Sequence, residues 1–200
     1  MHAASQPELE IFKILKGIKV VFDVGARTDI DYLMMRPSIE LHLFEPDKFF
    51  TEGLENELKR VGKVARVNKY GLGNEIGDFH YDPGSQSFMK IDGEFVYPVK
   101  TLNWYVKENG ITKIDLLKID TEGWDYKVLL GGSEILPNTK YIQYEHWDKP
   151  DIFRDLLEKD FDMEYIGYRN VFCMNKKLVS KKTRSKIIKF IRDNQFGKLA

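Results

Sequence analysis

The sequence predicts an α/β fold in which a mostly parallel sheet carries helices on both faces. Two observations lead to this prediction. Apolar segments typical of buried strands alternate with segments typical of helices, and the alternation repeats five times. Acidic residues follow four of the first five strands, which is the place where ligands bind in open parallel sheets.

The composition is typical of one globular domain with a sizeable core. The chain has 200 residues, of which 42% are hydrophobic and 13% aromatic. No apolar run approaches the roughly 20 residues of a membrane span, and the first ten residues lack the apolar core of a secretory signal. The single cysteine, Cys173, excludes an internal disulfide and a cysteine metal cluster. We therefore expect a reducing, cytoplasmic location.

The first predicted strand, Val20–Val24, contains a charge that needs an explanation. Its β-branched and aromatic residues are typical of a strand buried on both faces, yet Asp23 lies within it. An ionised carboxylate in such a place needs a cationic or hydrogen-bonding partner. Asp23 is therefore either a structural cap or a group whose partner arrives with a ligand.

Capping residues and glycines bound the elements that follow. Up to residue 110 we predict a short segment over Ile30–Arg36, strands over Glu40–Phe44 and Val64–Asn68, a helix over Lys48–Val61 between Asp47 and Gly62, a hairpin of Asp78–Tyr81 with Glu94–Val99, and a helix capped by Thr101 that ends at Gly110. Beyond residue 110 we predict strands over Ile114–Ile119, Tyr141–Tyr144, Met163–Tyr168 and Val171–Met174, and helices over Gly123–Leu130, Asp151–Lys159 after Pro150, and Ser180–Asp193. The last two strands are close in sequence and are expected to pair antiparallel.

The net charge is zero, but the charges are unevenly distributed. From Lys176 to Ala200 there are nine Lys or Arg residues and one acid, so the rest of the chain has a net charge of −8. We expect residues 1–179 to form the main domain, with a hairpin insertion at about 78–100, and residues 180–200 to form a basic helix. That helix is either a solvated arm or a surface for RNA or an anionic membrane.

Acids gather at the predicted sheet edge and repel each other unless a cation lies among them. These acids are Asp23, Glu45, Asp120, Glu122, Glu145 and Asp148. NAD is a poor fit, because its phosphates would lie beside Asp23 and the first turn has one glycine instead of three. S-adenosylmethionine is a better fit. It offers a ribose to Glu45, 22 residues after Asp23, and an ammonium and a sulfonium to the other acids, and it has no phosphate.

Six segments then point to one family. They are FDVGA, LFEPD, GLGNEIGDF, KTLNWYV, DLLKIDTEGWDYKVLLGG and YIQYE, in this order from about residue 20 to 145. In these segments the chain resembles FkbM-type S-adenosylmethionine-dependent methyltransferases, and KIDTEG soon after KTL is the most specific signal. The resemblance implies a Rossmann-like, seven-stranded methyltransferase fold with an antiparallel last strand. It also implies O-methylation, often of a sugar hydroxyl in a glycan or a glycosylated metabolite.

The resemblance also implies the residues that contact the cofactor. We expect these to be Asp23, Gly25, Ala26, Arg27, Glu45, Pro46, Gly71, Leu72 and Asp120. The family commonly has Asn and Gly where this chain has Arg27 and Asp29. Arg27 pairs either with the carboxylate of the cofactor or with a neighbouring acid.

Methylation of a sugar hydroxyl needs a base or a metal, because the hydroxyl is a poor nucleophile at neutral pH. The candidate catalytic residues are Asp120 near the sulfonium, Glu122 near the acceptor, and Glu145 with His146 for proton removal. An alternative is a divalent ion, Mg²⁺ or Mn²⁺, held by Asp120 and Glu145 with either His146 or Asp148. A surface histidine without a catalytic role is the other interpretation of His146.

The acceptor is expected to be a glycan or a glycosylated small molecule. Aromatic residues and serines between 78 and 100, among them Phe79, Tyr97 and Ser85, suit a lid over a sugar, although a hairpin with its own small core explains them equally. Trp124 and Trp147 either wall the pocket or pack beside it. The alternative functions are a non-catalytic cofactor-binding module and an RNA-binding or RNA-methylating domain that uses the basic tail. The chain is either a compact enzyme or one domain of a larger protein.

Overall fold

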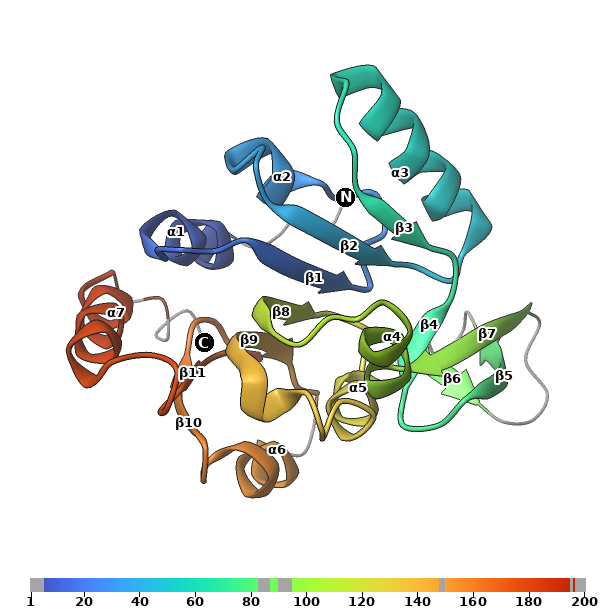
Figure 1. Ribbon diagram of the computed structural model, residues 1–200. Coiled ribbons are helices and arrows are strands. Elements are labelled where there is room, and N and C mark those ends of the chain that lie inside the picture. Colours follow the sequence, from blue (N-terminus) through green and yellow to red (C-terminus); the bar gives the residue numbers. More distant parts are fainter. Residues whose placement is uncertain (1–5, 83–86, 90–94, 148–149, 195, 197–200) are drawn as a thin grey trace.

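The structure is a computed structural model that describes residues 6–82, 87–89, 95–147, 150–194 and 196. At its centre is a seven-stranded sheet with the strand order β10-β11-β9-β8-β1-β2-β3 (Figure 1). Its strands are β1 (Val20–Val24), β2 (Glu40–Phe44), β3 (Arg66–Asn68), β8 (Ile114–Ile119), β9 (Thr139–Glu145), β10 (Phe161–Tyr165) and β11 (Asn170–Asn175). β11 is antiparallel to both of its neighbours, and the other adjacent pairs are parallel. The predicted fold class is confirmed.

Helices cover both faces of this sheet (Figure 1). One face carries α1 (Gln6–Ile14), α2 (Asp31–Met35), α3 (Lys48–Val61) and α7 (Lys181–Asp193), and the other carries α4 (Leu102–Glu108), α5 (Asp125–Leu130) and α6 (Pro150–Leu157). The central strands are buried between the two layers. Val21 and Phe22 of β1 point to opposite layers and are both fully buried, which contributes about 1.5–3 kcal/mol for each side chain.

Local capping signals define the helix ends, as predicted for Asp47, Thr101 and Gly62, while Ser180, predicted as the first residue of the last helix, is its N-cap. The side chains of Asp47, Thr101 and Ser180 accept hydrogen bonds from backbone N–H groups in the first turns of α3, α4 and α7. α3 ends at Gly62, whose φ of 64° is the left-handed conformation that favours glycine. A short 3-10 helix, Leu136–Asn138, leads into β9.

A second, four-stranded sheet lies beside the first, with the order β4-β7-β5-β6. Its strands are β4 (Gly71–Gly73), β5 (Gly77–Asp82), β6 (Ser87–Met89) and β7 (Phe95–Thr101). The predicted antiparallel pairing of the segments near 78 and 99 is confirmed by β5 and β7. β4 and β6 were not expected. The end of α5 lies so close to β4 that a Cβ on Gly131 would be 1.9 Å from the carbonyl oxygen of Gly73.

Two further helices differ from the sequence prediction. α1 was not predicted, although Ile11 and Phe12 anchor it in the core. α5 begins at Asp125 instead of Gly123, because Glu122 and Gly123 have φ angles of 54° and 93° and form a turn. The loop between β8 and α5 is therefore longer than the sequence suggested.

The basic C-terminal helix α7 is part of the packed structure. Ile187 and Ile191 are only 3% and 2% exposed and belong to the core under α1. Arg184 pairs with Asp162 of β10, and Arg192 pairs with Glu164 of the same strand. The expectation of a solvated arm, or of a helix that offers these isoleucines to a membrane, is wrong. Among the described helices, none has both the length and the apolarity that crossing a bilayer requires.

Candidate active site

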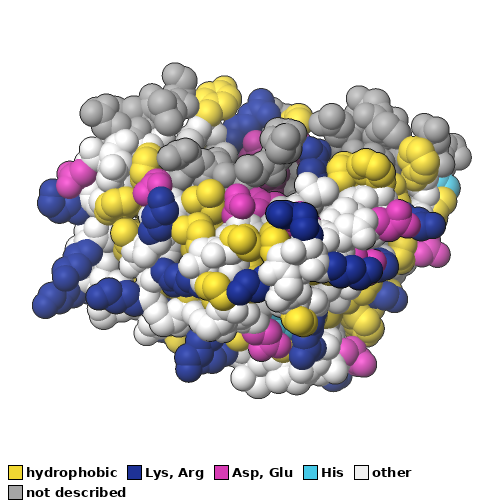
Figure 2. Space-filling view, turned by 90° about the horizontal axis from the view of Figure 1, so that it is seen from above, with side chains coloured by type: hydrophobic (Ala, Val, Ile, Leu, Met, Phe, Trp, Pro, Cys, Tyr) yellow, Lys and Arg dark blue, Asp and Glu magenta, His cyan; other side chains and the backbone are white. Residues whose placement is uncertain are grey.

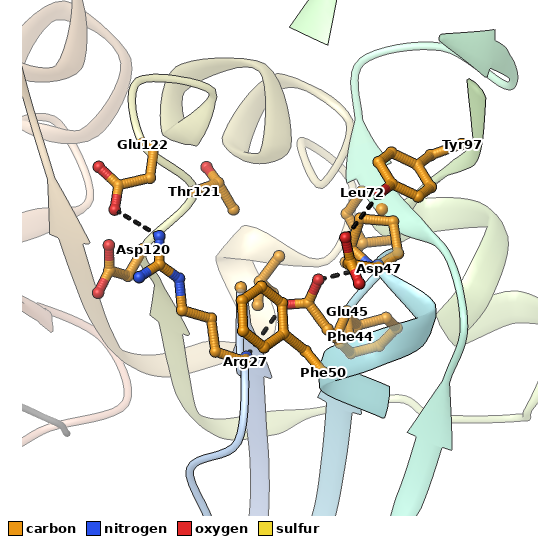
Figure 3. A pocket seen from close by; sticks show the side chains of 14 residues that line it. Arg27, Phe44, Glu45, Asp47, Phe50, Leu72, Tyr97, Asp120, Thr121 and Glu122 are labelled. Carbon is orange, nitrogen blue, oxygen red and sulfur yellow. Dashed lines mark hydrogen bonds and ion pairs between the residues drawn. The ribbon is translucent and has the colours of Figure 1, made fainter. Parts of the chain in front are cut away.

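A cavity opens at the carboxyl edge of the large sheet, where β1, β2 and β8 end (Figure 3). Its empty space, with the adjoining open solvent included, is about 660 Å³. Its lining consists of Val24, Gly25, Arg27, Phe44, Glu45, Pro46, Asp47, Phe50, Gly71, Leu72, Tyr97, Asp120, Thr121 and Glu122. Figure 3 shows Arg27, Asp120 and Glu122 at one end and the rings of Phe44 and Tyr97 at the other. The ring of Phe50 lies between them, 5.7 Å from the guanidinium carbon of Arg27. The cavity thus has a charged end and an end where aromatic rings lie together with the carboxylates of Glu45 and Asp47.

The turn after β1 brings the strand ends close together. Gly25 has a φ of 80°, and a Cβ at this position would lie 1.9 Å from the backbone oxygen of Asp120. The backbone N–H groups of Gly25 and Ala26 both donate to the carbonyl oxygen of Phe44, at 2.9 and 3.2 Å. Only glycine fits at position 25, because the φ angle is positive and because a Cβ would clash with the backbone of Asp120. Ala26, predicted to touch the cofactor, is buried behind the cavity and is not part of its lining.

Glu45 presents a fixed carboxylate to the cavity. One oxygen accepts a hydrogen bond from the backbone N–H of Arg27 and the other from that of Asp47, both at 3.0 Å. Burial raises the pKa of Glu45 above its ordinary range, while these two N–H groups act to lower it. Each oxygen has further lone-pair capacity for a ligand. The predicted site position of Glu45 agrees with this geometry.

An ion pair joins the two loops that border the charged end. The guanidinium of Arg27 lies 3.1 Å from a carboxylate oxygen of Glu122, as the dashed line in Figure 3 shows. Both residues have positive φ angles, 48° and 54°, which is uncommon for residues other than glycine. Of the two partners expected for Arg27, the structure shows the neighbouring acid.

Asp23 obtains its cation from the protein. The ammonium of Lys118, on the adjacent strand β8, lies 3.0 Å from one Asp23 carboxylate oxygen and 3.7 Å from an Asp120 oxygen. Asp23 is buried and is not among the residues that line the cavity. The expectation that a ligand brings this partner is therefore wrong, because it overlooked Lys118. Burial raises the pKa of Asp23 to about 7, although Lys118 acts to lower it.

A second buried acid, Asp125, ties the loop after β8 to the end of β9. One oxygen accepts hydrogen bonds from the backbone N–H and the hydroxyl of Thr121, and the other accepts from the backbone N–H of Glu145. Burial raises the pKa of Asp125 to about 7. In the sequence Asp125 lies inside the helix predicted over Gly123–Leu130, and its contacts with Thr121 and Glu145 were missed.

Glu145 and His146 behave differently at the end of β9. Burial, followed by the nearby charge of Asp120, raises the pKa of Glu145, whose carboxylate also accepts a hydrogen bond from the indole of Trp147 at 3.1 Å. The ring of His146 is buried instead against Phe153 of α6 and Tyr165 of β10. Burial lowers the pKa of His146. Glu145 thus lies close enough to Asp120 to be affected by its charge, and neither Glu145 nor His146 is part of the cavity lining.

The second sheet contributes Tyr97, whose role the sequence left open. Its hydroxyl donates to the carboxylate of Asp47 at 2.7 Å, and its ring lines the cavity. Phe79 is buried against Trp124, so both are packing residues. Ser85 and Asp148 lie outside the described residues. In the part of the chain that the structure describes, no group of three or more His, Cys, Asp or Glu side chains is placed to hold a metal ion.

The sequence is similar to those of known proteins. A profile of the methyltransferase FkbM domain matches residues 23–169. The 2-O-methyltransferase NoeI of Sinorhizobium fredii is 24% identical over 156 residues, which cover 65% of this chain and 64% of NoeI. The hexuronic acid methyltransferase AglP of Haloferax volcanii is 25% identical over 132 residues, which cover 63% of this chain and 55% of AglP. The chain thus spans less than two thirds of either relative.

The fold also matches solved structures. The structure of M. capricolum TrmK in complex with S-adenosyl-homocysteine superposes with a TM-score of 0.52 and 10% sequence identity. The superposition covers 95% of this chain and 83% of that chain. At this identity the match shows a shared Rossmann-like methyltransferase fold.

Proposed function

This chain belongs to the FkbM methyltransferase family, and from that premise we propose that it transfers a methyl group from S-adenosylmethionine to a sugar hydroxyl of a glycan or glycoconjugate. The observation that carries the proposal is the cavity, in which the fixed carboxylate of Glu45 lies beside aromatic rings at one end and Arg27, Asp120 and Glu122 lie at the other. The names of the relatives support the acceptor class, since one is a 2-O-methyltransferase and the other a hexuronic acid methyltransferase.

The residues present fit the cofactor. Glu45 has lone pairs to accept from two ribose hydroxyls, and Phe44, Leu72 and Tyr97 offer apolar surface to the adenine. On the other side Asp120 and Glu122 suit an ammonium and a sulfonium, and Arg27 suits a carboxylate. When bound, the cofactor supplies an electrophilic methyl carbon. A dinucleotide fits less well, because pyrophosphate would lie among carboxylates.

The chain itself must orient the acceptor hydroxyl and remove its proton. We assign Asp120 to orienting the cationic end of the cofactor, Glu122 to the acceptor hydroxyl and Glu145 to proton removal. The raised pKa of Glu145 supports this choice, since it makes the carboxylate a stronger base than an ordinary glutamate. Its neighbour His146 is the alternative base, and its packing against Phe153 counts against it.

A divalent ion is the other means of activating the hydroxyl. Asp120 and Glu145 are oxygen ligands of the kind that Mg²⁺ and Mn²⁺ prefer. The described residues supply no third ligand to this pair, so we derive no step through a metal. Turnover in EDTA, followed by addition of Mg²⁺ or Mn²⁺, tests for one directly.

The proposal is tested by incubating the protein with isotope-labelled S-adenosylmethionine and a panel of glycans that includes hexuronic acids and neutral sugars. Mass spectrometry should find the label on a sugar hydroxyl, and Asp120→Asn should greatly reduce labelling. Glu52→Gln, an exposed change on α3, is the control and should label at the wild-type rate. Label on RNA would favour an RNA methyltransferase. Binding of S-adenosylhomocysteine without transfer to any acceptor would favour a non-catalytic module.

A further inference from the structure

Lys118 occupies an unusual place for a charged side chain. It is the last residue but one of β8, the strand beside β1 at the centre of the sheet, and its side chain is only 5% exposed. Taking an ammonium out of water costs several kcal/mol unless good partners surround it. Strands buried on both faces normally consist of apolar residues. The position of Lys118 therefore calls for a reason beyond packing.

Lys118 belongs to a polar row that crosses the sheet. In the strand register Asp23 of β1 lies opposite Lys118, and Lys118 lies opposite Gln143 of β9, so the three side chains share one face. Two residues earlier, the equivalent row is apolar and consists of Val21, Leu116 and Tyr141. The fold thus accepts apolar residues in the neighbouring row on the same face of the sheet.

The row leads from the interior to the cavity. Lys118 and Asp120 are two residues apart, so their side chains leave the chain on the same side. The Lys118 ammonium lies between the two acids, 3.0 Å from Asp23 and 3.7 Å from Asp120. Asp23 is 1% exposed at its side chain, whereas that of Asp120 is 36% exposed and lines the cavity. Asp23 therefore anchors Lys118 from behind, and Lys118 contacts Asp120 from behind.

Stability does not account for this arrangement. Replacing a buried ion pair with apolar residues of similar volume is often neutral or stabilising, whereas removing one partner alone is strongly destabilising. Besides Asp23 and Asp120, the acid that acts on Lys118 is Glu8 of α1, and together they raise the pKa of Lys118 although burial acts to lower it. Lys118 is therefore a cation held directly behind the cavity.

We propose that Lys118, anchored by Asp23, is a positioning residue that orients Asp120 and partly neutralises it, and so sets how strongly the cavity prefers a cationic sulfonium cofactor to its neutral product. This inference rests on the proposed function, because it takes S-adenosylmethionine and S-adenosylhomocysteine as the two ligands. The two differ in one charge at sulfur. A residue that tunes the charge of Asp120 changes their relative affinities, while a purely structural residue changes both together.

Two variants shift the charge behind Asp120 in opposite directions. Asp23→Asn leaves the Lys118 cation without its anchor, so S-adenosylmethionine should weaken relative to S-adenosylhomocysteine by about 5- to 10-fold. The double variant Asp23→Leu with Lys118→Met removes the cation beside Asp120 and replaces both partners by apolar groups. It should fold stably, and the ratio of affinities should move the other way by about 2- to 5-fold, which is less because the charge of Asp23 is removed together with that of Lys118.

The measurement is the dissociation constant of each ligand by isothermal titration calorimetry, beside the thermal unfolding temperature. Gln143→Leu is the matched control, because it removes an equally buried polar side chain from the same row without touching Asp120. Its ratio of affinities should equal that of the wild type.

Opposite shifts in the two variants support the inference, and the double variant decides alone if Asp23→Asn does not fold. If the folded double variant keeps the wild-type ratio of the two affinities, because both affinities change equally or not at all, Lys118 is purely structural. A wild-type protein that binds neither ligand would overturn the proposed function and this inference together. A wild type that binds both with a ratio insensitive to these changes overturns the inference alone.

Discussion

Replacement of Glu45 tests the cofactor site most directly. The carboxylate accepts two backbone N–H groups and has capacity left for two ribose hydroxyls. A hydrogen bond to a charged group contributes about 1.5–3 kcal/mol, so Glu45→Ala should weaken S-adenosylhomocysteine binding by about 10- to 150-fold. Calorimetry with this non-reacting product measures the loss without an acceptor.

The same substitution has a structural cost that must be separated from binding. Glu45 is 5% exposed, and its removal leaves the N–H groups of Arg27 and Asp47 without their acceptor. We expect the free energy of unfolding to fall by about 1–3 kcal/mol for each group that water does not reach. Glu45→Gln keeps one oxygen acceptor and should lie between Ala and wild type in both measurements. The exposed change Glu52→Gln should alter neither.

The reasoning fails if folded Glu45→Ala protein binds S-adenosylhomocysteine as tightly as the wild type does. In that case the carboxylate would serve only the two turns, and the ribose would lie elsewhere. Binding and folding are both measured well below the unfolding temperature of the variant. A loss of binding under these conditions cannot be caused by unfolding.

Four shorter predictions concern the remaining parts of the site and the core. Gly25→Ala should lose cofactor binding and stability together, because its Cβ would meet the Asp120 carbonyl, and a normal unfolding curve would contradict this. Asp125 has a pKa of about 7 when folded and about 4 when unfolded, so its contribution to stability is complete below pH 4 and is lost as the pH rises through 7. Compared with Asp125→Asn, the wild type should therefore lose up to about 4 kcal/mol more between these pH values in urea unfolding experiments, and parallel curves would count against it. Glu145→Gln should reduce turnover about 10²–10⁴-fold and His146→Ala less than about tenfold, and the reverse order would make His146 the base. Ile187→Ala should lower the unfolding free energy by about 2–4 kcal/mol, whereas no change would restore the picture of α7 as an external arm.

The parts of the fold that could be predicted are those set by local chemistry. Asp47, Thr101 and Ser180 cap helices through hydrogen bonds within one turn, so a short stretch of sequence contains the whole signal. The strands that end beside Asp23 and Glu45 were equally clear, because each is a short segment rich in β-branched, leucine or aromatic residues and is followed by a turn. Three acids follow predicted strands and were therefore expected at the carboxyl edge of the sheet. They are Glu45, Asp120 and Glu122, and all three line the cavity.

The parts that were missed depend on pairing between distant segments. Lys118 is one cation in an apolar strand, and its meaning appears only when the register sets it opposite Asp23, 95 residues earlier. Tyr97 reaches the cavity because the second sheet folds back toward α3, where its hydroxyl meets Asp47. No short stretch of sequence could have predicted either contact.

The alternation of side chains along a strand also explains why Glu145 and His146 cannot serve together. Lys118 lies opposite Gln143 in the register, so Glu145, two residues on, is on the face that Asp120 shares. Tyr144 and His146 point the other way, toward Phe153 of α6, and both contact its ring. The sequence argument considered only that the two strands are adjacent, which applies to both residues alike. The alternation separates them, because it puts the carboxylate of Glu145 on the face of Asp120 and the imidazole of His146 against α6.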